Sequence, residues 1–136
     1  MICCPLSEGD EPASLCNATY RVARKEHKCT ECVRSISVGT KHKLIKMLYD
    51  GAWESYRICT LCDEIGKHFA CGQSRVIGAL WTDLEENFFP DMKAGGPCME
   101  GLSPEAESRL FEARTAWLFE RDQDEYRVAL PPRSLP

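Results

Sequence analysis

Two Cys-x-x-Cys pairs, Cys29/Cys32 and Cys59/Cys62, constrain the fold of this chain more than any other feature of its sequence. Two residues between cysteines allow both thiolates to face one ion, and two such pairs complete a tetrahedral site. The spacing therefore predicts one structural Zn²⁺ ion held by these four cysteines. Because all four ligands are protein sulfurs, the site has no open position for a reactive water, and a catalytic metal is not expected.

The segment between the two pairs predicts a β-hairpin. Residues 37–40 can turn the chain, and residues 41–49 form a strand candidate rich in Leu, Ile, Met and Tyr. Asp50-Gly51 is a hairpin turn signal, and residues 53–58 can return as the partner strand. A short helical face should follow, formed by Leu61, Ile65 and Phe69. The expected fold class is α+β, with a treble-clef zinc module (knuckle, β-hairpin, helix) followed by two amphipathic α-helices.

Other interpretations of the cysteines remain open. Rubredoxin-like iron sites have similar spacing but favour glycine after each pair, where Val33 and Asp63 stand here. A redox pair of the thioredoxin type would leave the second pair unexplained. One cysteine ligand could also be replaced by a neighbouring residue, the candidates being His27, His42, His68 and Cys71. The remaining cysteines are expected to be free thiols: Cys3, Cys4, Cys16 and Cys98.

The chain divides by pattern into a loose arm over residues 1–20, the zinc module over 21–72 and an acidic helical part over 73–136 packed on the module. Residues 74–89 predict an amphipathic helix with Ser74 as N-cap. Its apolar stripe is Val76, Ile77, Leu80, Trp81, Leu84 and Phe88, with Asp83, Glu85 and Glu86 facing away. A second helix should begin at Ser103-Pro104 and end near Gln123. Its apolar stripe is Ala106, Leu110, Phe111, Ala113, Trp117 and Leu118.

The net charge of −4 conceals an asymmetry between the two halves. Residues 21–46 hold eight Lys/Arg and two acids, whereas residues 71–136 hold seven bases and twelve acids. This asymmetry indicates contact with nucleic acid, contact with a protein partner, or complementarity between the two halves of the chain, and the acidic helices could mimic nucleic acid. The candidate binding residues are Arg21, Arg24, Lys25, Lys28, Lys41, Lys43, Lys46 and Trp53.

Catalysis is not expected from the motifs present. HNH nucleases also build on a treble clef, but their chemistry needs a histidine on the hairpin, and Tyr49-Asp50-Gly51 supplies only an acid. The sequence also lacks a Gly-rich phosphate loop and a nucleophile elbow. The N-terminus has no signal-peptide pattern, and no stretch approaches the roughly 18 apolar residues of a membrane helix. A cytosolic protein that is not an enzyme is therefore expected.

The segments ARKEHKCTEC, DGAW, YRICTLC and GALWTDL together resemble small treble-clef proteins of tailed phages and prophages. The resemblance covers about residues 21–86 and carries over the ligands Cys29, Cys32, Cys59 and Cys62; Val33 departs from the glycine that is frequent there. It implies a zinc-supported fold and a mobile-element origin. By analogy, such a protein would bind and inhibit a host protein or nucleoprotein complex, including defence complexes such as CRISPR effectors. The alternative is a transcriptional regulator that binds nucleic acid through the basic face.

Overall fold

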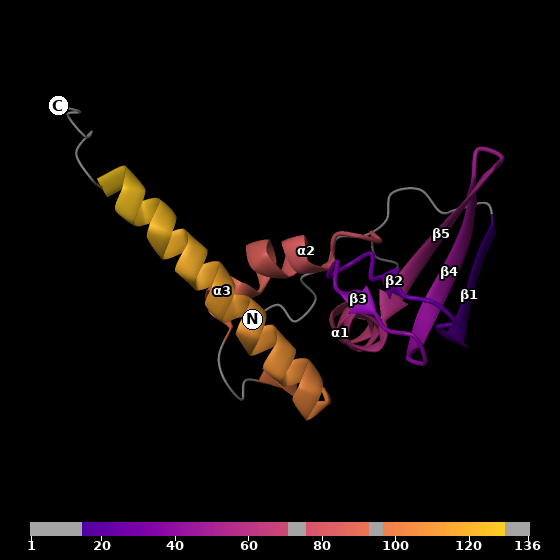
Figure 1. The fold of residues 1–136 in the computed structure, drawn as a ribbon. Helices are drawn as coiled ribbons and strands as arrows, with labels where there is room; N and C mark the ends of the chain where they lie inside the picture. Colours follow the sequence, from indigo (N-terminus) through magenta and orange to yellow (C-terminus); the bar gives the residue numbers. More distant parts are fainter. Residues whose placement is uncertain (1–14, 71–75, 93–96, 130–136) are drawn as a thin grey trace. The chain divides into compact units, whose positions relative to one another are not determined.

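A computed structural model of the chain describes residues 15–70, 76–92 and 97–129. Within these residues the fold is α+β, as expected, with a three-stranded antiparallel sheet, a two-stranded ribbon and three α-helices (Figure 1). The chain forms two compact units, Met1–Leu102 and Ser103–Pro136, and each is described by itself. The predicted boundaries at 20/21 and 72/73, and the packing of 73–136 on the module, stay predictions.

The sheet has the strand order β1-β4-β5, with β4 (Lys41–Tyr49) between β1 (Leu15–Val22) and β5 (Ala52–Cys59). The hairpin between β4 and β5 is confirmed. Asp50 and Gly51 both adopt positive φ, 47° and 78°, which is the backbone of the two-residue turn that joins twisted strands most readily.

β1 corrects the expectation of a loose arm over residues 1–20. Residues 15–20 belong to this strand, which pairs with β4 along its full length, from Leu15 opposite Leu48 to Val22 opposite Lys41. Local periodicity could not reveal the strand because its hydrogen-bonding partners are distant in the chain, as with Leu15 and Leu48. Residues 1–14 lie outside the described part of the chain.

The core of the first unit lies between the sheet and α1 (Thr60–Ala70), which contacts β4 and β5. Ile58 and Ile65 are fully buried, and so is Phe69 near the end of α1. The Phe69 ring lies 4.7 Å from the Phe88 ring, centroid to centroid. This contact joins the end of α1 to the segment after α2 (Leu80–Asn87).

The helix predicted over 74–89 is shorter than expected. It begins at Leu80, because Gly78 adopts a φ of 91° that no helix allows. The Glu31 carboxylate, from the first cysteine turn, accepts hydrogen bonds from the Gly78 amide at 2.5 Å and the Leu80 amide at 3.5 Å. A distant side chain therefore caps this helix. Two details were also wrong, since Val76 is exposed and Asp83 is buried; the expected cap, Ser74, lies outside the described residues.

The second unit contains α3 (Pro104–Ala129). Its predicted start is confirmed, because the Ser103 hydroxyl accepts a hydrogen bond from the Ala106 amide at 3.2 Å. The helix continues to Ala129, six residues past its predicted end near Gln123. The apolar stripe is buried only at its start: Ala106 and Leu110 are fully buried, whereas Leu118 is exposed. Phe119, outside the stripe, is also exposed.

Candidate metal centre

The first cysteine pair lies in a tight turn between β2 (His27–Lys28) and β3 (Ser35–Ile36), which form a short antiparallel ribbon. The Cys29 amide donates to the Arg34 carbonyl at 2.9 Å, and the Val33 amide donates to the Cys29 carbonyl at 2.9 Å. Val33 closes this turn with a φ of 63°. The turn is a knuckle of the kind that brings two sulfurs to one ion.

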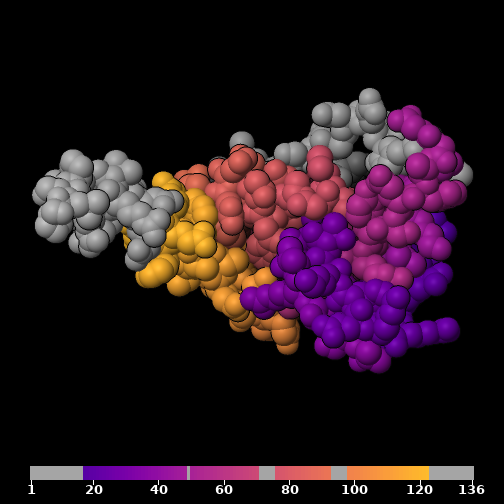
Figure 2. All heavy atoms as spheres, turned by 45° about the horizontal axis from the view of Figure 1, so that its top comes forward, coloured from indigo at the N-terminus to yellow at the C-terminus, as the bar shows by residue number. Residues whose placement is uncertain are grey.

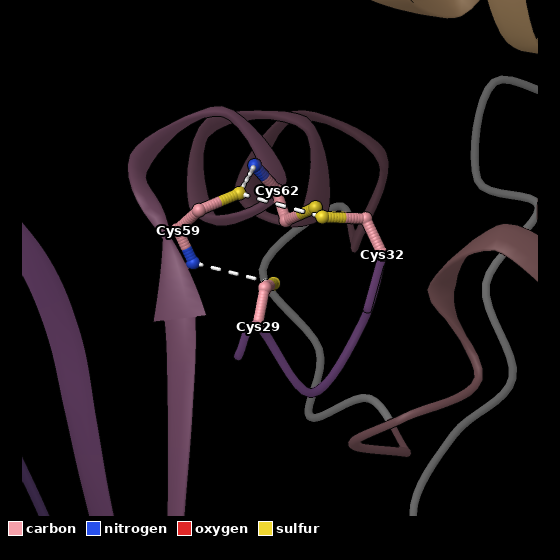
Figure 3. A group of neighbouring side chains, drawn as sticks. All are labelled: Cys29, Cys32, Cys59 and Cys62. Carbon is pink, nitrogen blue, oxygen red and sulfur yellow. Dashed lines mark hydrogen bonds between the residues drawn. The ribbon is translucent and has the colours of Figure 1, made fainter. Parts of the chain in front are cut away.

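The second pair lies where β5 passes directly into α1. Cys59 is the last residue of the strand, and Cys62 lies in the first turn of the helix. The Thr30 amide of the knuckle donates to the Arg57 carbonyl of β5 at 2.8 Å. This hydrogen bond holds the knuckle against the strand end, so the two pairs face each other (Figure 3).

The four sulfurs converge on one point. The Sγ atoms of Cys29, Cys32, Cys59 and Cys62 all lie within 4.8 Å of one another, and Cys32 Sγ lies 3.9 Å from Cys59 Sγ. A tetrahedral ion with Zn–S bonds of about 2.3 Å separates its sulfurs by about 3.8 Å. The cluster is therefore compatible with one structural zinc site. Cys29 and Cys62 are almost completely buried, which closes the site on the side of the core.

Backbone and indole N–H groups donate to these sulfurs. The Cys59 amide donates to Cys29 Sγ at 3.3 Å, and the Cys62 amide donates to Cys59 Sγ at 3.5 Å (Figure 3). A further donor is the indole N–H of Trp81, which lies 3.4 Å from Cys62 Sγ. Such donors spread the negative charge that thiolates carry when they bind a metal. Trp81 was predicted to lie in an apolar stripe or to anchor a partner, because nothing in its local pattern shows that its indole reaches Cys62.

Hydrogen bonds among the sulfurs shift the pKa values of the thiols in different directions. Contacts with Cys29, then Cys32 and Cys59, raise the pKa of Cys62 far above its usual range, and burial raises it further. Contacts with the same cluster lower the pKa of Cys32, with Cys29 as the largest cause. A divalent cation must displace the protons of these thiols when it binds.

None of the three histidines belongs to the cluster. His68 Nε2 donates to the Cys98 carbonyl at 2.6 Å, and His42 Nε2 lies 2.6 Å from Arg57 Nη1. The His27 ring lies 5.7 Å from the His42 ring, centroid to centroid. Within the described residues, the only group with metal-ligand geometry is the four cysteines themselves.

The free-thiol prediction is wrong for Cys98, which is disulfide-bonded. The predictions for Cys3, Cys4 and Cys71 fall outside the described residues, as does the side chain of Cys16.

The predicted binding residues do not form a single group. Arg21, Arg24 and Lys25 line one cavity together with His27 and Arg57. Partial burial, then the positive charges of Arg57 and Lys25, lower the pKa of His27. The cavity is therefore a region of positive potential, and Arg57 is a member that sequence analysis did not find.

The other predicted binding residues have different surroundings. Lys43 is paired with the buried Asp63 at 3.2 Å, so its charge is already neutralised. Lys41 lies over the Tyr20 ring, 5.3 Å from its centroid. Lys28, Lys46 and Trp53 are exposed, with Trp53 next to the hairpin turn. Their role in binding stays a prediction.

No protein-family model, no curated protein and no solved structure matches this chain. The resemblance to phage treble-clef proteins therefore stays a prediction. Of the helices in residues 15–70, 76–92 and 97–129, none has the length and apolar character needed to cross a bilayer.

Proposed function

We propose that this chain is a zinc-stabilised interaction protein and not an enzyme. The observation that carries the proposal is the convergence of four cysteine sulfurs within 4.8 Å, two of them almost fully buried. One Zn²⁺ bound to all four would join the knuckle, the end of β5 and the start of α1. This order of elements supports a treble clef. With four sulfur ligands the ion has no position for a reacting water, so its role is to hold the fold.

The partner that we propose first is a host protein or nucleoprotein complex in the cytosol, which the protein binds and inhibits, as a phage counter-defence protein such as an anti-CRISPR would. The support is the sequence resemblance over about residues 21–86 and the acidic character of α3. This helix places Glu105 and Glu107 in its first turn. An acidic helix of this kind can occupy a basic groove that normally receives nucleic acid.

The alternative, a transcriptional regulator that binds nucleic acid, is favoured by a different observation. Arg21, Arg24 and Arg57 line a common cavity on the zinc module. Clustered arginines are the usual contacts to phosphate groups.

One experiment tests these proposals together. The tagged full chain, expressed with zinc, is recovered from host lysate with and without nuclease, and its metal content is measured on the same sample. We expect one zinc per chain and a discrete partner that survives nuclease treatment. Recovery only through nucleic acid would favour the regulator, and a preparation without metal would overturn the zinc proposal.

A further inference from the structure

A cavity of about 890 Å³ lies on the zinc module, beside the first cysteine turn and outside the metal cluster. Its charged lining comes from the end of β1, the following loop, β2 and β5, and consists of Arg21, Arg24, Lys25, His27 and Arg57. In Figure 2 the indigo segment that carries most of these residues is at the surface, with long side chains standing out into solvent. Because Arg21, Arg24 and Lys25 are exposed, a ligand can reach the cavity directly.

Among the described residues, the exposed cations of this lining have no acidic partner. Arg21, Arg24 and Lys25 are exposed, and none of them forms an ion pair within the described residues. By contrast, Lys43 and Lys67 of the same module both pair with Asp63. Like charges that gather without a counter-charge repel one another and destabilise the fold. A conflict of this kind is typical of a functional site, at which a bound anion removes the repulsion.

Arg57 is held in place by a buried histidine. Its Nη1 lies 2.6 Å from His42 Nε2, and because a guanidinium can only donate, His42 Nε2 must accept. His42 is fully buried, and its Nδ1 has no hydrogen-bond partner among the described residues. Arg21 lies directly opposite His42 in the β1–β4 register, so Arg21, His42 and Arg57 share one face of the sheet. The sheet therefore fixes the spacing of two arginines at the cavity.

We propose that this cavity binds adjacent phosphate groups of a nucleic-acid strand. The inference rests on the nucleic-acid alternative above and names its contact site. A planar guanidinium offers paired donors that match phosphate oxygens, and three arginines with one lysine can serve more than one phosphate. The cavity lies within the usual size range of ligand sites, about 300–1,000 Å³.

The lining contacts phosphates rather than bases. Among the lining residues only His27 carries a ring, and Val22 and Ala23 are the only apolar members. Binding of bases generally relies on aromatic rings on which they stack. Binding at this cavity is therefore independent of sequence and sensitive to salt.

The test uses fluorescence anisotropy with the zinc-loaded full chain and a labelled single-stranded 15-nucleotide probe, over a series of salt concentrations. At low salt we expect a Kd on the order of 10 µM, typical of non-specific binding, and similar values for probes of different sequence. Tripolyphosphate serves as a second ligand, because it offers adjacent phosphates without a nucleic-acid backbone.

Two double variants with the same change in charge locate the site. Arg21→Gln with Arg24→Gln removes two lining cations, whereas Lys28→Gln with Lys46→Gln removes two exposed lysines that do not line the cavity. We expect the arginine variant to lose about 10-fold or more in affinity and to reduce the salt slope by about 1.4, at about 0.7 per cation. The lysine variant should change affinity less than about threefold.

Three results would overturn the inference. The first is an equal loss of oligonucleotide affinity in the two variants. The second is a chain that carries one zinc but binds no oligonucleotide, and the third is a chain that binds tripolyphosphate but no oligonucleotide. Metal content and circular dichroism, measured on every sample, separate these results from a failure of the zinc proposal, which would appear as a chain without metal.

Discussion

Val33 adopts a backbone conformation that is unfavourable for its β-branched side chain. Its φ of 63° lies in the left-handed region, which costs an L-residue about 1–2 kcal/mol, and a β-branched residue is among the least suited to it. Replacement by glycine removes this strain but adds about 0.5–1 kcal/mol of chain entropy in the unfolded state. We expect Val33→Gly to increase the free energy of unfolding by about 0.5–1 kcal/mol, measured by urea denaturation of the zinc-loaded chain.

Val38 provides the matched control for this substitution. It is also a loop valine, exposed at 64% against 66% for Val33, but it does not have a positive φ. Val38→Gly should therefore lower the free energy of unfolding by about 0.5–1 kcal/mol. If both variants lose stability equally, strain at Val33 is not significant.

Asp63 bonds to side chains on the face of the sheet opposite to Arg21 and Arg57. It accepts a hydrogen bond from the Tyr20 hydroxyl at 2.6 Å and pairs with Lys43 at 3.2 Å and Lys67 at 3.3 Å. Burial raises its pKa, but the bonds from Tyr20 and Lys43 and the charges of both lysines outweigh that effect, so the pKa is lowered overall. A lowered pKa stabilises the fold above the unfolded value of about 3.9, and this stability is lost as the pH falls through the folded-state pKa.

At pH 7, therefore, Asp63→Asn should lower the free energy of unfolding by about 1–3 kcal/mol, since it leaves the Tyr20 hydroxyl and the Lys43 ammonium without a charged acceptor. Chemical denaturation of the zinc-loaded chain measures this loss. Lys67→Gln is the control, because Lys67 is largely exposed and its pair should contribute less than about 1 kcal/mol. A loss as large in Lys67→Gln as in Asp63→Asn would contradict this account.

Among the helices and strands, the sequence alone predicted the features that depend on residues close together in the chain. The strand at 41–49 and the turn at Asp50-Gly51 follow from residues that are neighbours in the chain, and so does the cap at Ser103. β1 and α2 depend on distant partners instead. β1 needs the edge of β4, and α2 begins where Glu31, 49 residues before Leu80, caps its amides. No local pattern contains these partners.

Trp81 gives α2 a role at the metal centre that can be tested. Trp81→Phe keeps a large apolar ring but removes the N–H that donates to Cys62 Sγ at 3.4 Å. Loss of one outer donor typically weakens metal affinity by about 10-fold or more. We expect zinc to transfer about 10-fold faster to a chromogenic chelator, with little change in circular dichroism.

Trp53→Phe is the control for that measurement. Trp53 is 60% exposed and lies next to the hairpin turn, so its replacement should leave the rate of zinc transfer unchanged. Equal rates in wild type and Trp81→Phe would show that the indole does not support the thiolates.

At the scale of the whole molecule, the ligand set and the cationic cavity differ in how far sequence could predict them. The four cysteines are identified by spacing alone, because metal geometry fixes the distance within each pair. The cavity could be predicted only in part, since Arg57 joins Arg21 and Arg24 through strand register. Lys43 was assigned to the same basic surface, but the structure pairs it with Asp63, a tertiary contact that composition cannot show.

The last prediction concerns the metal and the stability of the first unit. Chelation, or Cys29→Ser, should abolish the cooperative unfolding of this unit, because structural zinc contributes on the order of 10 kcal/mol. Because cysteine thiols must lose their protons to bind zinc, affinity rises with pH and zinc is released on acidification. Near-ultraviolet circular dichroism with metal analysis between pH 8 and about pH 4 measures both effects. Cys98→Ser, which alters a cysteine outside the cluster, should retain one zinc per chain. A chain that keeps its cooperative transition after complete metal removal would show that packing, rather than the ion, holds the knuckle against α1.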